Sequence, residues 1–258
     1  MRMILSVILL AALASSGCEP NTNGNANRNG NANNISTYKP PPPLAPKEAV
    51  NPNFQSCNPY FPLVPGSVAK YVVNHSSGLV GDATVVVDAE QQDGRTVFVE
   101  RTQMVDRSGG LQHLQSTVRQ YVCDGERILL ISEKNDTRVE ERTTINENRY
   151  RENTVAMVDT AALAQKGTTW TVVFTQTFQS PGEPLATLPD PTTVTFTVVG
   201  PQDVTIPTGA VKTVAVQRKV KENIGTDYYA RGLGLVKRET KEGMRWELRE
   251  YSGLRPMD

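Results

Sequence analysis

Histidine and cysteine are scarce in this chain of 258 residues, which contains two histidines and three cysteines. Nucleophilic catalysis needs a base beside a serine or cysteine, and structural zinc needs clustered cysteines and histidines. His75 and His113 lie in separate segments, and the sequence contains no G-x-S-x-G motif. We therefore predict no catalytic residue, no metal site and no cofactor, and expect a protein that is not an enzyme.

An excess of one charge is also missing, because 27 basic residues balance 27 acidic residues. Domains that bind nucleic acid usually carry a basic patch, so we expect no nucleic-acid partner. Long apolar runs are missing too. The main run, residues 4–14, is shorter than the roughly 20 residues that a membrane-spanning helix needs.

The first residues have the layout of a secretory signal. Arg2 precedes the apolar run, and small residues at 15–17 precede Cys18. The segment ASSG-C resembles a bacterial lipobox, in which the cysteine is acylated and becomes the mature N-terminus. We predict a signal peptide at 1–17 and a lipid anchor on Cys18, with an ordinary signal peptide and an incidental cysteine as the alternative. Several acyl chains suffice as an anchor, so this resemblance implies export and attachment to a bacterial membrane, at the outer membrane or the periplasmic face.

Residues 18–53 have a composition that opposes folding. The first part is rich in Asn and Gly, and the second part contains the run KPPPPLAP. Neither part can bury an apolar face, so we predict a disordered tether. The folded domain is then expected at 54–258.

Cys57 and Cys123 remain if Cys18 is acylated. An even pair in an exported protein suggests a disulfide. The alternative is two buried thiols that lie far apart, since a disulfide requires a geometry that sequence cannot test.

Alternation of apolar and polar residues dominates from residue 54 onward. The segments 83–89, 169–178 and 193–198 place Val, Phe or Trp on one face and Thr or charged residues on the other. This period of two, with turn pairs such as Asp93-Gly94 and Asp124-Gly125, is typical of antiparallel strands. We predict an all-β, mostly antiparallel fold, either a curved sheet or an open barrel.

Some local features refine this prediction. Gly109-Gly110 and Asn135-Asp136 are interpreted as further turns, and the charged segment 137–151 as a solvated or edge strand. One short helix is expected at 161–166, capped by Asp159 or Thr160.

Two segments carry a family resemblance. They are FPLVPGSVAKY at 61–71 and the block 204–251, which contains P-T-G, YYARGLGLVKRE and W-E-L-R-E-Y. Both segments resemble parts of the DUF3108/TapB-like exported β-domains, although Ala69 stands where that pattern has Trp. The resemblance implies a β-rich envelope domain and no catalytic residues. Within the block, Gly232 and Gly234 are expected to allow a positive φ or a bulge.

We therefore expect a non-enzymatic, membrane-anchored envelope lipoprotein with a binding or structural role and a candidate protein partner in the envelope. The alternative is a carrier of a lipid or another apolar ligand. Its binding surface would use five aromatic residues that otherwise simply form the core, namely Trp170, Phe174, Phe196, Tyr228 and Trp246.

Overall fold

The computed structural model describes residues 42–76, 78, 80–106, 113–139, 142–180 and 182–257. The chain divides into two units, Met1–Pro43 and Leu44–Asp258, and all the strands belong to the second. The predicted signal peptide, Cys18, the tether up to residue 41 and the Gly109-Gly110 turn lie outside the described residues. Within the described part, no helix is long and apolar enough to cross a membrane.

The second unit is all-β with one short helix. Its elements are β1 (Val68–His75), β2 (Val80–Gln92), β3 (Arg95–Asp106), β4 (His113–Asp124), β5 (Arg127–Val139), β6 (Arg142–Tyr150), β7 (Val155–Met157), α1 (Thr160–Leu163), β8 (Thr169–Gln179), β9 (Ala186–Thr187), β10 (Thr192–Ile206), β11 (Gly209–Val220), β12 (Asn223–Ala230), β13 (Gly234–Thr240) and β14 (Met244–Ser252). All the pairings between these strands are antiparallel, which confirms the predicted fold class.

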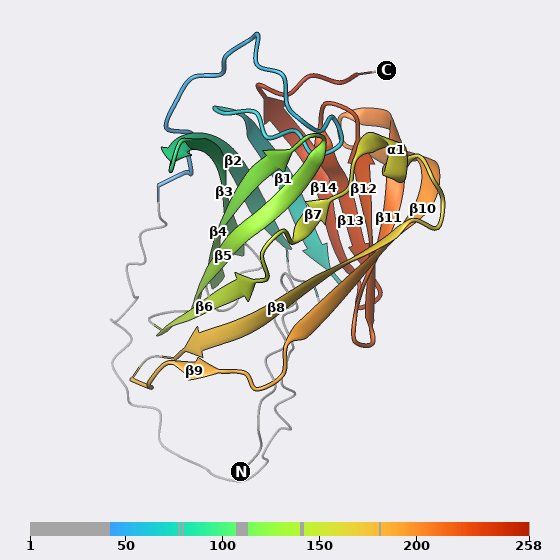
Figure 1. Ribbon diagram of the computed structural model, residues 1–258. Coiled ribbons are helices and arrows are strands. Elements are labelled where there is room, and N and C mark those ends of the chain that lie inside the picture. Colours follow the sequence, from blue (N-terminus) through green and yellow to red (C-terminus); the bar gives the residue numbers. More distant parts are fainter. Residues whose placement is uncertain are drawn as a thin grey trace, which may run out of the picture. The chain divides into compact units, whose positions relative to one another are not determined.

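The sheet closes on itself. Neighbouring strands follow the order β10-β11-β12-β13-β14-β1-β2-β3-β4-β5-β6-β8, and β8 pairs again with β10. The twelve strands of this ring surround one interior, while β7 and β9 only add to it (Figure 1). A curved sheet or an open barrel was expected, and the β8–β10 ladder turns that curvature into a closed barrel.

The period of two places the residues as expected. On β8, Trp170 and Val172 are buried while Thr169 and Thr171 are exposed. One face of each strand therefore lines the interior, and the other face lies on the outside. The helix α1 also forms where expected, since the Asp159 side chain accepts a hydrogen bond from the Ala162 amide and caps it.

The block 204–251 folds into the end of β10 and strands β11 to β14. Gly232 and Gly234 have φ values of 75° and 76°, and the ladder shifts register between Tyr228 and Tyr229. A Cβ on Gly232 would lie 1.7 Å from the Arg255 carbonyl oxygen, so the chain approaches too closely there for any side chain. These observations confirm the predicted bend.

Two local predictions are wrong. Asn135-Asp136 is not a turn, because both residues lie inside β5. The segment 137–151 was expected to be a solvated or an edge strand; the edge alternative is wrong, because β6 pairs with β5 on one side and β8 on the other, while residues such as Glu147 and Arg149 are exposed. Asn and charged residues usually mark turns and solvated edges. Here Asn135 is buried and hydrogen-bonded inside the closed sheet, a context that sequence alone does not reveal.

The loop at 54–63, here called the cap, packs against the aromatic core at one end of the barrel. Phe61 contacts Tyr121 with ring centroids 5.3 Å apart, and Phe54 contacts Phe98 at 6.0 Å. In the structure, a disulfide joins Cys57 in the cap to Cys123 on β4, with their Cα atoms 6.2 Å apart. The cap is thereby held covalently to the barrel wall.

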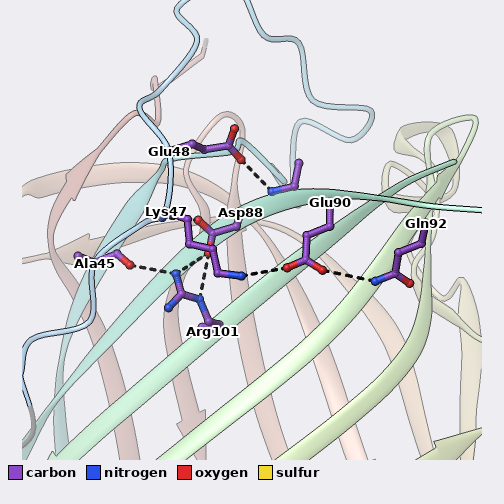
Figure 2. A network of polar contacts seen from close by, with 8 residues as sticks. Ala45, Lys47, Glu48, Asp88, Glu90, Gln92 and Arg101 are labelled. Atoms are coloured by element: carbon purple, nitrogen blue, oxygen red, sulfur yellow. Dashed lines mark hydrogen bonds and ion pairs between the residues drawn. The ribbon is translucent and has the colours of Figure 1, made fainter. Parts of the chain in front are cut away.

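Residues 45–50, here called the strap, lie against β2 and β3 (Figure 2). The Lys47 amide donates to Asp88 Oδ1 at 2.6 Å, and Arg101 donates to both Asp88 and the Ala45 carbonyl. Asp88 is 1% exposed. A Cβ on Gly66 would lie 2.6 Å from the Val50 amide nitrogen, so the strap also fits tightly against the start of β1.

The folded unit therefore begins earlier than composition suggests, at Leu44 rather than residue 54. The strap buries no large apolar face of its own. Backbone hydrogen bonds and ion pairs hold it instead, and their partners lie 41 to 56 residues further along the chain. Composition cannot reveal contacts of that range.

Candidate functional site

A row of polar side chains crosses five neighbouring strands on the inner face of the barrel. The register pairs them directly from strand to strand, in the order Glu100, Arg119, Glu133, Asn148 and Gln176. We call this row the polar belt. It faces inward because Glu100 follows the core residue Phe98 by two positions and Arg119 precedes the core residue Tyr121 by two.

Hydrogen bonds link most of the belt. Arg119 lies between two carboxylates, with Nη1 at 2.9 Å from Glu100 and Nε at 2.5 Å from Glu133. Glu133 also accepts from the Asn148 side chain at 2.6 Å and from Asn135 at 2.9 Å. The result is one guanidinium shared by two carboxylates, of which Glu133 is buried and Glu100 is partly buried.

The belt keeps Glu133 ionised. Burial by itself would raise the pKa of this carboxyl, but Arg119 and the two asparagine side chains stabilise the charged form. Their combined effect outweighs burial and lowers the pKa of Glu133 below its ordinary value.

A second charged cluster lies on β11, β12 and β13. Arg238 binds Asp227 through two parallel hydrogen bonds of 2.6 and 2.7 Å. The Asp227 pKa is raised by burial but lowered more strongly by Arg238, so it lies below its ordinary value. Arg218 is the third member, and its Nε lies 4.0 Å from Asp227 Oδ2. This cluster therefore has two guanidiniums for one carboxylate.

The two clusters lie on different parts of the ring. Along the shorter path, β13 and β4 are separated by β14, β1, β2 and β3. Burial and the neighbouring Arg238 are the larger causes that lower the pKa of Arg218, and the charge of Arg119 lowers it further.

Several inward polar atoms have no hydrogen-bond partner among the described residues. They are Arg119 Nη2, Arg218 Nε, Trp170 Nε1, Trp246 Nε1, Gln176 Nε2 and Asn148 Oδ1. The arginine and tryptophan atoms can only donate. Buried donors usually have acceptors, because an unsatisfied buried group costs about 1–3 kcal/mol. The interior therefore contains several buried donors that have no acceptor among the described residues.

Two side chains of the belt are not fully buried. Glu100 and Arg119 keep 16% and 12% of their side-chain surface exposed. Barrel interiors widen with strand number, and eight-stranded barrels are about filled by their own side chains or hold one small ligand. This ring has twelve strands.

Four of the five aromatic residues named from the sequence lie on the inner face, namely Trp170, Phe174, Phe196 and Trp246. Trp170 and Phe196 stack with ring centroids 5.1 Å apart and an interplanar angle of 12°. Tyr228 differs, because it lies on the outer face near Lys237 and its hydroxyl is 3.3 Å from Glu239. Its neighbour Tyr229 is the inward ring.

Both charged clusters are absent from the sequence-based predictions. Their members belong to strands that are distant in sequence, and each appears there as an ordinary polar residue of an alternating strand. One usable signal existed: Arg238 and Asp227 break the apolar side of strands whose other inward residues are apolar or aromatic.

The other predicted features lie outside the clusters. His75 ends β1, and His113 begins β4. No group of three or more His, Cys, Asp or Glu side chains in the described residues could hold a metal ion. A pocket of about 530 Å³ lies near Cys123, at the start of β3 and the end of β4, and none of the five named aromatics lines it.

Comparison with known proteins supports the fold. A crystal structure from Bacteroides fragilis NCTC 9343, of a protein inferred to be exported and with a YmcC-like fold, is similar with a TM-score of 0.50. The two sequences are 13% identical over 76% of this chain and 100% of the other. At this identity, the likeness shows the fold alone. No family model matches the sequence. No curated protein matches it either.

Proposed function

We propose that this chain is a non-enzymatic envelope protein, anchored through acylated Cys18, that binds a ligand inside its closed barrel. One observation supports the binding role: several buried, inward-facing donors have no partner among the described residues. A barrel with a purely structural role would gain stability from apolar side chains at these positions, because unpaired buried donors cost free energy.

The location rests on the N-terminal sequence. A basic residue, an apolar run and small residues before Cys18 support export and lipid attachment. Kinship with the DUF3108/TapB-like exported β-domains belongs to the same proposal, and it rests on the segments 61–71 and 204–251.

Replacement of the anchor tests the location. Cys18→Ser should move the full-length protein from the membrane fraction to the soluble fraction of its host, whereas Cys57→Ser should leave it with the membranes. A Cys18→Ser protein that stays in the membrane fraction would overturn the anchor.

Native mass spectrometry of the full chain, purified from its own host, tests the binding role. We expect a mass increment of a small molecule that disappears on denaturation. A bare chain in every preparation would contradict binding inside the barrel, and a co-purifying protein without a small molecule would favour a partner on the outer surface.

A carrier of a purely apolar ligand is the second candidate. The stacked Trp170 and Phe196 rings favour it, since they offer apolar surface on the inner face. The unpartnered donors favour a ligand that also accepts hydrogen bonds, so a hydrocarbon without polar atoms in the mass spectrum would decide for this alternative.

A further inference from the structure

Arg218 is the buried cation of the barrel with the weakest partner. It is 4% exposed and faces inward on β11. The register pairs it with Phe196 on β10 and with Gly225 on β12. A Cβ on Gly225 would lie 3.4 Å from Arg218 Nη2, so the absence of a side chain there leaves room for the guanidinium.

The carboxylate nearest to Arg218 is already engaged. Arg238 donates one hydrogen bond to each oxygen of Asp227, at 2.6 and 2.7 Å. Arg218 Nε lies 4.0 Å from the same carboxylate, and it donates to no acceptor in the part of the chain that the structure describes. One positive charge on this wall is therefore not neutralised by a carboxylate of its own.

The other unpaired groups on this side of the barrel indicate which kind of ligand Arg218 would bind. Trp170, stacked on Phe196, and Trp246, paired with Arg238, add indole N–H groups without acceptors among the described residues. Guanidinium and indole groups only donate, so the partner must accept. A negative charge satisfies both the charge of Arg218 and its unpaired Nε, whereas a neutral acceptor satisfies only the Nε.

The stacked rings of Trp170 and Phe196 offer a surface for the apolar part of the same ligand. Phe196 is directly opposite Arg218 in the ladder and is only partly buried. An apolar chain can lie against such a ring while its charged end reaches the guanidinium.

We propose that Arg218 binds the anionic head group, a carboxylate or a phosphate monoester, of an amphiphile whose apolar body lies along the Trp170–Phe196 stack. This inference rests on the proposed binding function and specifies the ligand class. The rest of the cluster positions Arg218, because the Asp227–Arg238 pair occupies the acceptor that would otherwise neutralise it.

Tryptophan fluorescence can test this directly, because both tryptophans of the chain lie on the inner face. The full chain, stripped of ligand, is titrated with dodecanoate, dodecyl phosphate and dodecanol below their micelle concentrations. We expect saturable changes with both anions and binding of dodecanol at least about tenfold weaker, since a charged hydrogen bond contributes roughly 1.5–3 kcal/mol.

Matched variants of one strand assign the effect. Arg218→Gln should weaken both anions to the affinity of dodecanol, Arg218→Lys should retain part of the preference, and Lys219→Gln should bind as the wild type does. Lys219 is the exposed neighbour of Arg218 on β11, so its variant loses the same charge from the outer face. Circular dichroism confirms that each variant is folded.

Two outcomes would overturn the inference. If the wild type binds dodecanol and dodecanoate with equal affinity, the protein does not recognise the negative charge. If folded Arg218→Gln binds the anions as the wild type does, another residue recognises the charge. A neutral molecule found by native mass spectrometry would leave the binding function in place and remove this inference alone.

Discussion

The two charged clusters inside the barrel use the same chemistry in opposite proportions. On β3 to β5, one arginine, Arg119, serves the two carboxylates of Glu100 and Glu133. On β11 to β13, two arginines, Arg218 and Arg238, share Asp227. The first wall therefore has a surplus of negative charge and the second a surplus of positive charge.

The two clusters also differ in whether their charged groups have hydrogen-bond partners. The carboxylates of the first wall have donors, since Asn135, Asn148 and Arg119 all bind Glu133. The cation Arg218 on the second wall has no acceptor at hydrogen-bond distance of its Nε among the described residues. The carboxylates of the first cluster are satisfied, although Arg119 Nη2, Gln176 Nε2 and Asn148 Oδ1 of the belt also lack partners among the described residues. An unsatisfied buried group costs stability unless something binds it. This difference can be tested by measuring the free energy of unfolding of the full chain and of its variants.

The largest effect is expected for Asp227→Asn. This change leaves two buried arginines without a carboxylate, and breaking a buried ion pair in this way costs about 3–5 kcal/mol. The measurement is the free energy of unfolding from urea titrations. Asp203→Asn, at an exposed position on β10, should stay within about 0.5 kcal/mol of the wild type.

A smaller loss is expected for Glu133→Gln, about 1–3 kcal/mol. Arg119 still has Glu100, and the glutamine oxygen still accepts one hydrogen bond. Glu147→Gln, on the exposed face of β6, is the control. A larger loss of unfolding free energy for Glu133→Gln than for Asp227→Asn would contradict the expected order. The fold would then depend more on the cluster with two carboxylates than on the cluster with two arginines.

Acid should weaken both walls. Glu133 and Asp227 have lower pKa values in the folded chain than in the unfolded chain, despite the opposing effect of burial. Their contribution to stability is complete above the unfolded values of about 4, and it is lost as the pH falls through the folded values. Urea unfolding at pH 7, 5 and 3 should show this loss in the wild type and a flatter dependence in Asp227→Asn. If the free energy of unfolding falls with pH equally in the wild type and in Asp227→Asn, Asp227 does not contribute to the pH dependence.

The smallest effect is expected for Arg218→Gln in the ligand-free chain. Removal of the surplus cation relieves its desolvation and its repulsion with Arg238, so stability should stay within about 1 kcal/mol of the wild type or rise. The same urea titration measures it. A loss as large as that of Asp227→Asn would mean that Arg218 holds the wall together and is not a residue kept for binding.

Local pattern was a good guide to the strands and a poor guide to the interior. The alternation at 169–178 and the glycines at 232 and 234 predicted β8 and the bend before β13, because these signals depend on neighbouring residues. Asn135-Asp136 was predicted to be a turn but lies inside β5. The same residue types form turns at a surface and hydrogen-bonded rows in a polar interior. Tyr228 and Tyr229 were a pair in the sequence, but which ring faces inward depends on the bulge between them.

The sequence by itself determined the all-β class, the antiparallel turns and the capped short helix, since each depends on residues close together in the chain. Only the tertiary structure decided that β8 meets β10, that the strap belongs to the folded unit, and that Arg119 lies between Glu100 and Glu133. Closure brings together residues from strands far apart in sequence, and their charges interact only because the barrel removes them from water. The candidate binding site is a consequence of that closure.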